Sequence, residues 1–224
     1  MSSVPWPPIE PPPLEVVFPE PPPGQDVVAV SRSMSPALVL AAYREGIFPW
    51  PVRQGVVPWA SPDPRAVFPL QPARPWPRTV RRAVKAGFTV TFDRAFERVL
   101  RECGDRGTEG TWITPDVVDT YGALHRMGWA HSVEVWSGDA LAGGLYGLAL
   151  GTLFAGESMF HRETGASKVA FAALADRLRE RGFEIFDVQV LTEHLASLGC
   201  ITVPRAEYRA AARAAVGRQA RFGD

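Results

Sequence analysis

Two polar side chains, two residues apart, interrupt an otherwise apolar stretch late in the chain. Asp187 and Gln189 fall in residues 183–190, which predict a β-strand, and alternation puts both on one face with Ile185. An amide and a carboxylate at this spacing can jointly orient an incoming amine: Gln189 polarises a carbonyl group, and Asp187 attracts the ammonium or its proton. They can also form a satisfied polar pair at a strand end, which is the interpretation that the residues alone favour, although both stay open.

A second carboxylate stands in an apolar setting. Glu157 follows Gly156 within residues 152–160, which also predict a strand. An unpaired buried carboxylate is strongly penalised, so Glu157 needs a partner there. Strict alternation places Phe154 and Glu157 on opposite faces of this strand.

The sequence contains none of the common motifs of metal sites or catalytic nucleophiles. The four histidines form no H-E-x-x-H arrangement, and neither Cys103 nor Cys200 belongs to a C-x-x-C pair. The sequence contains no G-x-S-x-G elbow and no Walker loop. We therefore expect no metal site and no cofactor, and we expect both thiols to be unpaired in a reducing compartment.

One short pattern points to an acyl-coenzyme A enzyme. Residues Arg162-x-x-Gly165-x-Ser167 resemble the R/Q-x-x-G-x-G/A loop with which acetyltransferases bind a pyrophosphate at a helix N-terminus. The same residues also describe an ordinary helix start with Ser167 near the N-cap, which needs no ligand.

Basic residues are concentrated in one short segment. The formal net charge is zero, so contact with a nucleic acid requires a local basic patch. Five cations without intervening acids form the candidate patch: Arg74, Arg78, Arg81, Arg82 and Lys85. At helical spacing the last four share one face and suit a row of phosphates. The alternative is a solvated helix face.

The remaining elements predict an α+β protein. Ser35-Pro36 begins a helix that ends at Gly46, whereas the proline- and tryptophan-rich stretch from residue 48 to 77 predicts an irregular region without regular elements. Then follow a helix at 79–86, a strand at 88–93, and a helix capped by Asp93. A helix from Thr114, strands at 131–136, 140–149 and 152–160, and a helix at 166–181 come next. Strand 183–190, helix 192–199, strand 200–203 and a helix from 205 complete an order that fits the N-acetyltransferase-like fold.

The bulk properties limit where the protein works. A hydrophobic fraction of 46% indicates a real core, and no run approaches the roughly 18 apolar residues of a membrane helix. The N-terminus lacks the features of a secretory signal, so we expect a cytoplasmic protein without membrane contact. Residues 1–24 hold two triple-proline runs and little apolar surface, which predicts a flexible tail.

Several long motifs occur in a fixed order. They are Gly46-Ile47-Phe48-Pro49-Trp50, Pro58-Trp59-Ala60-Ser61-Pro62-Asp63-Pro64-Arg65, Thr111-Trp112-Ile113-Thr114-Pro115, Ala130-His131-Ser132-Val133-Glu134-Val135-Trp136, Gly143-Gly144-Leu145-Tyr146-Gly147, Phe154-Ala155-Gly156-Glu157-Ser158-Met159-Phe160, Ala166-Ser167-Lys168, Asp187-Val188-Gln189 and His194-Leu195-Ala196-Ser197-Leu198-Gly199. Together they resemble the leucyl/phenylalanyl-tRNA–protein transferase family over about residues 26–210.

The resemblance implies a fold and an activity. It implies a small N-terminal domain (25–66), an acetyltransferase-like (GNAT-like) domain with an antiparallel or mixed sheet flanked by helices (67–216), and a C-terminal tail (217–224). It implies a monomer that transfers Leu, Phe or Met from aminoacyl-tRNA to proteins beginning with Arg or Lys, marking them for degradation.

The resemblance also assigns site residues. Asp187, Gln189 and Glu157 would act on the aminoacyl group, with Glu157 facing its amine. The apolar pocket would be formed by Trp50, Trp112, Phe154, Met159 and Phe186. Alternation turns Phe186 away from Asp187, which favours an ordinary core position, and a bulge at Gly156 would reconcile Phe154 with Glu157.

The chain departs from the family pattern in a few places. Ala60 replaces a usual tryptophan, His161 a frequent serine and Val188 a common cysteine, and Ser31-Arg32-Ser33 stands where Gly-Gly-Asp is usual. None of these residues is one to which we assign chemistry. Two alternatives stay open: an acyl-coenzyme A-dependent N-acyltransferase and a non-catalytic tRNA-binding module.

Overall fold

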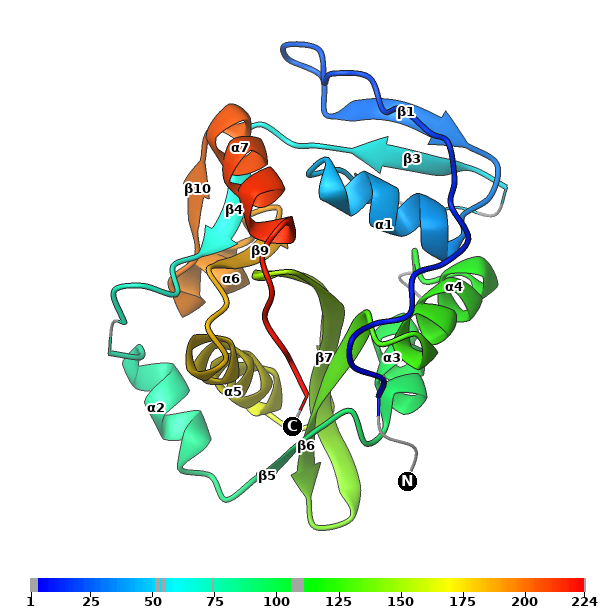
Figure 1. The fold of residues 1–224 in the computed structure, drawn as a ribbon. Helices are drawn as coiled ribbons and strands as arrows, with labels where there is room; N and C mark the ends of the chain where they lie inside the picture. The colour runs from blue at the N-terminus through cyan, green and yellow to red at the C-terminus, as the bar shows by residue number, and fades with distance from the viewer. Residues whose placement is uncertain (1–3, 51–52, 54, 74, 106–110, 224) are drawn as a thin grey trace.

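The computed structural model describes residues 4–50, 53, 55–73, 75–105 and 111–223. A small three-stranded antiparallel sheet and a seven-stranded mixed sheet organise these residues (Figure 1). The small sheet has the order β1-β3-β2 and contains β1 (Val27–Ser31), β2 (Phe48–Pro49) and β3 (Val57–Ala60). The chain is therefore an α+β protein, as the sequence predicts.

The large sheet has the order β10-β4-β9-β8-β7-β6-β5. Its strands are β4 (Arg65–Phe68), β5 (Thr89–Phe92), β6 (Ala130–Ser137), β7 (Ala140–Leu150), β8 (Leu153–His161), β9 (Ile185–Gln189) and β10 (Ile201–Val203). Strands β8 and β9 pair in parallel, while the other neighbours in this sheet are antiparallel. The predicted meander of three strands is confirmed as β6, β7 and β8.

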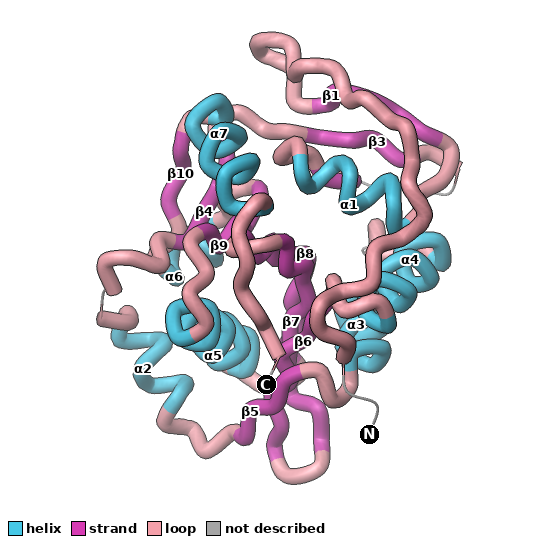
Figure 2. The backbone as a smooth tube through the Cα atoms, viewed as in Figure 1, coloured by secondary structure: helices cyan, strands magenta, loops and turns pink. Residues whose placement is uncertain are grey.

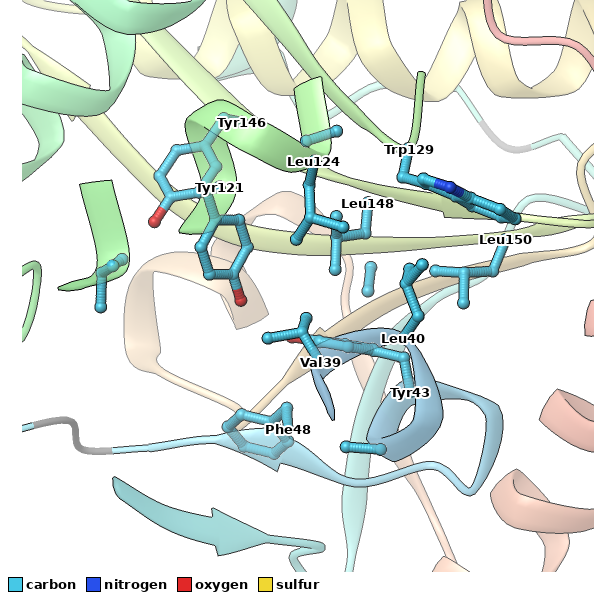
Figure 3. Packing of buried hydrophobic residues seen from close by; sticks show 14 of the residues in the cluster. Val39, Leu40, Tyr43, Phe48, Tyr121, Leu124, Trp129, Tyr146, Leu148 and Leu150 are labelled. Atoms are coloured by element: carbon cyan, nitrogen blue, oxygen red, sulfur yellow. The ribbon is translucent and has the colours of Figure 1, made fainter. Parts of the chain in front are cut away.

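Helices cover both faces of the large sheet (Figure 2). The helices are α1 (Pro36–Arg44), α2 (Arg78–Val84), α3 (Phe96–Gly104), α4 (Pro115–Arg126), α5 (Ala166–Glu180), α6 (Glu193–Leu198) and α7 (Arg205–Val216). Helices α1, α3, α4 and α7 contribute to one core cluster, and α2 and α5 contribute to the other. Strand β7 supplies both, with Tyr146 and Leu148 in the first and Leu145 in the second, as alternation requires. Figure 3 shows the first cluster, where residues of α1, α4 and β7 pack together.

The expectation of no regular structure between residues 48 and 77 is wrong. Strands β2, β3 and β4 lie in this region, and each has two to four residues. Runs this short show no readable alternation, and prolines lie within β2 and β3 and on both sides of β4. Strand β4 also spans the expected domain boundary at residues 66 and 67, and it pairs with β9 and β10 in the large sheet.

Asp93 does not cap α3. The N-cap of that helix is Ala95, without a side-chain cap. Asp93 instead has a positive φ of 57°, and its carboxylate accepts hydrogen bonds from His131 Nδ1 at 2.8 Å and from the Ser132 amide at 2.9 Å. Asp93 therefore binds His131 and Ser132 on the neighbouring strand β6 and not the first turn of α3.

The proline-rich segment lies against the body through specific contacts. The Ile9 amide donates to Met127 O at 2.7 Å, and Trp129 Nε1 donates to Ile9 O at 2.8 Å. Glu20 pairs with Arg209 and Arg213 on α7. The expectation of a flexible tail rests on the low apolar content of the segment and does not take these polar contacts into account. Mobility of the segment in solution stays a prediction.

The C-terminal residues also reach the core. Phe222 is 1% exposed and stacks on Phe154 and His131. Cys103 and Cys200 are buried, and neither thiol forms a disulfide bond, as expected. No helix among the described residues is long and apolar enough to cross a membrane.

Candidate functional site

A pocket opens where two neighbouring strands of the large sheet separate. The parallel pairing of β8 with β9 ends at Ala155 and Asp187, although β8 continues to His161 and β9 to Gln189. Beyond this point the strands line a pocket of about 430 Å³. A cavity at such a split can receive a ligand from outside and still present backbone and side-chain polar groups to it.

The pocket has largely apolar and aromatic walls. Four of the five predicted pocket residues line it, namely Trp50, Trp112, Met159 and Phe186. The walls also include Phe48, Leu145, Tyr146, Phe171, Val188 and Leu195, which the sequence analysis did not assign to the pocket.

The structure does not bring Phe154, the fifth predicted pocket residue, to the wall of this pocket. Its side chain is fully buried and packs against the rings of Phe183, Phe186 and Phe222. Phe154 opposes Ala149 on β7, in a part of β8 where regular pairing persists. It therefore belongs to the core on the α5 side of the sheet.

A β-bulge sets the direction of Glu157. On β7, Tyr146 pairs with Ser158 and the next residue pairs with Gly156, so Glu157 is the extra residue of β8. The predicted bulge near Gly156 is therefore present. The absence of a side chain at Gly156 leaves space for the Phe186 ring, because a Cβ at position 156 would lie only 3.2 Å from that ring.

Glu157 and Gln189 meet at the polar end of the pocket, which both residues line. Tyr43 on α1 donates a hydrogen bond to Glu157 Oε1. The amide Nε2 of Gln189 donates to Tyr43 Oη at 3.1 Å and lies 3.5 Å from Glu157 Oε2. A carboxylate and an amide thus share one tyrosine beside an apolar cavity.

Asp187 lies behind this end of the pocket. Its side chain is fully buried and does not line the cavity. Both carboxylate oxygens accept hydrogen bonds from Arg65, and Tyr208 Oη donates to Oδ2 at 2.7 Å. The Gln189 backbone amide donates to Oδ1 at 2.9 Å. The structure therefore brings Asp187 to Gln189 through the backbone.

Burial changes the ionisation of Glu157. Desolvation raises the pKa of its carboxyl group to about 7, although the hydrogen bond from Tyr43 lowers it in part. The Glu157 pKa is thus higher in the folded than in the unfolded chain, whose usual value is 4.5. Between these values the folded state binds more protons, so stability falls as pH rises.

We expect Glu157→Gln to remove this pH dependence, because the amide keeps the size and does not ionise. In the parent, the free energy of unfolding should decrease from pH 5 to pH 7 by up to about 1.4 kcal/mol per pH unit. Urea unfolding at pH 5, 6, 7 and 8 measures it. Glu193→Gln, which removes an exposed carboxylate on α6, is the control. Equal pH slopes in parent and Glu157→Gln would show that Glu157 does not titrate in this range.

The basic residues of α2 and of its C-cap, Lys85, form an exposed concave face. Arg78, Arg81, Arg82 and Lys85 together line a shallow depression of about 340 Å³. The prediction that these four side chains share one face is confirmed. Arg74 lies outside the described residues.

The loop that resembles a coenzyme A motif is occupied by protein contacts. Arg162 forms ion pairs with Glu102 and Asp105, each at 2.6 Å. A Cβ at Gly165, the N-cap of α5, would lie 3.1 Å from the Ala83 Cβ of α2. Helix α2 therefore lies close over the helix start that would bind a pyrophosphate. Within the described residues, no group of three or more His, Cys, Asp or Glu side chains could hold a metal ion.

Sequence reasoning missed the residues that hold the polar end together, Tyr43, Arg65 and Tyr208. They come from α1, β4 and α7, and the contacts between Arg65 and Asp187 span 122 residues. The sequence shows only that Arg65 stands between Pro64 and the apolar run Ala66-Val67-Phe68, where a buried arginine would need an acidic partner, and it does not show which residue that partner is.

Comparisons with known proteins agree on one family. The family model described as leucyl/phenylalanyl-tRNA protein transferase matches residues 67–213, and the model of that family's N-terminal domain matches residues 32–63. The leucyl/phenylalanyl-tRNA–protein transferase of Anaeromyxobacter sp. strain K is 49% identical over 207 residues, which is 88% of this chain and 87% of that protein.

A second relative and one solved structure complete the comparison. The protein of the same name from Stutzerimonas stutzeri strain A1501 is 48% identical over 201 residues, with coverage of 88% and 87%. The structure of L-PGS from Bacillus licheniformis is 16% identical, with a TM-score of 0.43 over 58% of this chain and 48% of that one. From the matches to its two family models and the identity to its relatives, the chain belongs to the leucyl/phenylalanyl-tRNA–protein transferase family.

Proposed function

We propose that this protein transfers Leu, Phe or Met from aminoacyl-tRNA to the N-terminal α-amine of proteins that begin with Arg or Lys. The observation that carries the proposal is the pocket at the split between β8 and β9, with apolar walls and an amide–carboxylate pair at one end. Family membership supports the same reaction. We further propose an N-acetyltransferase-like fold for the larger part, a monomeric protein and a cytoplasmic location, where charged tRNA is made.

The reaction asks little of the enzyme beyond positioning. The aminoacyl ester is already activated, and an α-amine with an unperturbed pKa of about 7.7–8.0 is partly neutral near neutral pH. Its nitrogen attacks the ester carbonyl carbon, a tetrahedral oxyanion forms, and the bond to the ribose oxygen breaks. The amine loses a proton and the ribose oxygen gains one, so the products are an amide and a free ribose hydroxyl.

The residues of the pocket divide this work. Gln189 lines the end of the cavity, and its Nε2, which donates to Tyr43 in the structure, would donate to the carbonyl oxygen as that oxygen gains charge. Glu157 would bind the amine of the aminoacyl group. While it is bound, this amine would not act as a nucleophile. The aromatic walls accept a Leu, Phe or Met side chain, and one methylene more or less in such a site changes binding by roughly 1–3 kcal/mol. Asp187 would act from behind by orienting Gln189.

A single incubation separates this proposal from its alternatives. The protein is given Leu-tRNA, acetyl-coenzyme A and a peptide that begins with Arg, and the peptide mass is measured. We expect a product heavier by one leucyl residue. A peptide heavier by one acetyl group would identify the acyl-coenzyme A enzyme. Binding of tRNA without any product would identify a tRNA-binding module.

The basic face of α2 would hold the tRNA backbone. Arg81→Ala and Arg82→Ala are each expected to weaken binding and to reduce the slope of log K against log salt concentration by about 1, because each removes a phosphate contact. Fluorescence anisotropy of labelled tRNA from 50 to 200 mM salt measures both quantities. Arg32→Ala, at an exposed site in the turn after β1, removes the same charge and should keep the parental slope. Equal slopes in all four proteins would refute the assignment.

A further inference from the structure

Arg65 ends the conspicuous Ser61–Arg65 motif, and nothing in the proposed chemistry uses it. Its side chain is fully buried. Arg65 Nε donates to Asp187 Oδ1 at 2.8 Å and Nη2 donates to Oδ2 at 2.6 Å, so the guanidinium grips the carboxylate as a fork. The third nitrogen, Nη1, donates to Gly46 O at 3.2 Å. Each nitrogen of the guanidinium therefore has a defined partner.

Asp187 connects Arg65 to Gln189. The carboxylate that Arg65 fixes accepts the Gln189 backbone N–H at 2.9 Å. Gln189 has φ of 65°, in the left-handed region that a residue with a side chain rarely adopts. Such a conformation persists only where the surroundings determine it. The hydrogen bond from its backbone N–H to Asp187 stabilises this conformation of Gln189. In this conformation the side-chain amide of Gln189 points toward Tyr43 and Glu157.

A second route leads from Arg65 to the pocket wall. Its guanidinium lies 4.6 Å from the centre of the Phe48 ring and 4.4 Å from that of Tyr208. Phe48 lines the pocket and belongs to β2 of the small sheet. Tyr208 also donates to Asp187 Oδ2 at 2.7 Å. One cation thus contacts an apolar wall of the pocket and, through Asp187, its polar end.

We propose that Arg65 is a positioning residue for aminoacyl transfer, which sets the direction of the Gln189 amide through Asp187 and fixes the Phe48 wall. The inference rests on the proposed function. Stability alone does not account for the pair, since replacing a buried ion pair by apolar residues is often neutral or stabilising. A planar fork that holds both carboxylate oxygens fixes an orientation, which a lysine with one point charge cannot do.

The test is Arg65→Lys, which keeps the charge and loses the fork. We expect the single-turnover rate at saturating Leu-tRNA to fall by on the order of 10-fold or more, because a small displacement of the amide misplaces it for the reaction. The dissociation constant for Leu-tRNA should stay at the parental value, because the side-chain contacts of Arg65 are with Asp187, Gly46, Tyr208 and Phe48 and not with the basic side chains of α2. Tyr208→Phe is the milder second variant: it removes one donor to Asp187 and keeps the ring over the guanidinium.

Arg205→Lys is the matched control. Arg205 is 7% exposed and donates to the carbonyl oxygens of Gln25, Ser61 and Pro22, away from the pocket. It should lower the melting temperature and keep the parental transfer rate. If Arg65→Lys and Arg205→Lys reduce the rate only in proportion to the folded fraction, Arg65 is structural and the inference is overturned.

A double-mutant cycle and an exchange measurement complete the test. If Arg65 acts mainly through Gln189, Arg65→Lys should cost far less in a Gln189→Ala background than in the parent, whereas additive losses would contradict the inference. By NMR, the amide proton of residue 189 should exchange slowly in the parent and quickly in Arg65→Lys. A parent that transfers nothing would refute the proposed function. Exchange at residue 189 would then still decide whether Arg65 holds Gln189, because unchanged protection in Arg65→Lys would overturn the inference.

Discussion

Gln189→Ala is expected to lower the maximal rate of transfer by on the order of 10²-fold or more, with Leu-tRNA affinity nearly unchanged. Loss of one donor to a developing oxyanion typically costs about 2.7–4 kcal/mol of transition-state stabilisation. The substitution removes the amide at the end of the pocket and leaves the aromatic walls and the α2 face intact. The measurement is single-turnover transfer to an Arg-starting peptide at saturating Leu-tRNA.

The control for this substitution is Gln219→Ala, which removes the same amide from an exposed position after α7. Gln219→Ala should transfer at the parental rate. A Gln189→Ala protein with near-parental rates would reduce Gln189 to a structural residue and leave catalysis to the positioning of the substrates.

The second prediction with a large expected effect contrasts a core residue, Phe154, with a pocket residue, Trp112. Phe154→Ala should destabilise the fold by about 3–5 kcal/mol, because its ring is fully buried among other rings. Trp112→Ala should lose transfer of Leu and Phe with a smaller loss of stability, because Trp112 is partly exposed and lines the pocket. Urea unfolding and transfer rates of both variants test this contrast. If Trp112→Ala unfolds and Phe154→Ala keeps its stability while losing transfer, the assignment of both residues is reversed.

Local patterns were sufficient for much of the fold. Helices α4 and α5 have a proline or a glycine near their starts and a clear apolar period, and the hairpin between β6 and β7 turns at Gly138. Such elements carry their own signal over eight or more residues. Strand β4 has four residues and depends on pairing with β9, more than 100 residues later, so no local pattern reveals it.

The candidate site was predicted in part for the same reason. Alternation and the family motifs gave Glu157 and Gln189, which line the pocket. Alternation also turns Phe186 away from Asp187, yet Phe186 lines the pocket, because the cavity lies at the split between strands and receives side chains from both faces of the sheet. Arg65 stayed hidden, since its partner is known only once β4 and β9 are neighbours.

The N-terminal segment illustrates a limit of composition. Low apolar content predicts that ordering entropy exceeds the gain from burial. Its contacts are instead backbone hydrogen bonds at Ile9 and charged pairs at Glu10 and Glu20, with Phe18 packed edge-on against Trp59. A count of apolar residues does not include partners that only the folded body supplies.

A structure of the protein with an amide-linked 3′-leucyl-adenosine tests the central claim most directly, since the amide cannot be transferred. We predict the leucyl side chain between the Trp50 and Trp112 walls of the pocket, its amine toward Glu157, and its carbonyl oxygen within about 2.7–3.2 Å of Gln189 Nε2. Electron density for the leucyl group in another cavity, or a carbonyl oxygen beyond reach of Gln189, would contradict the account.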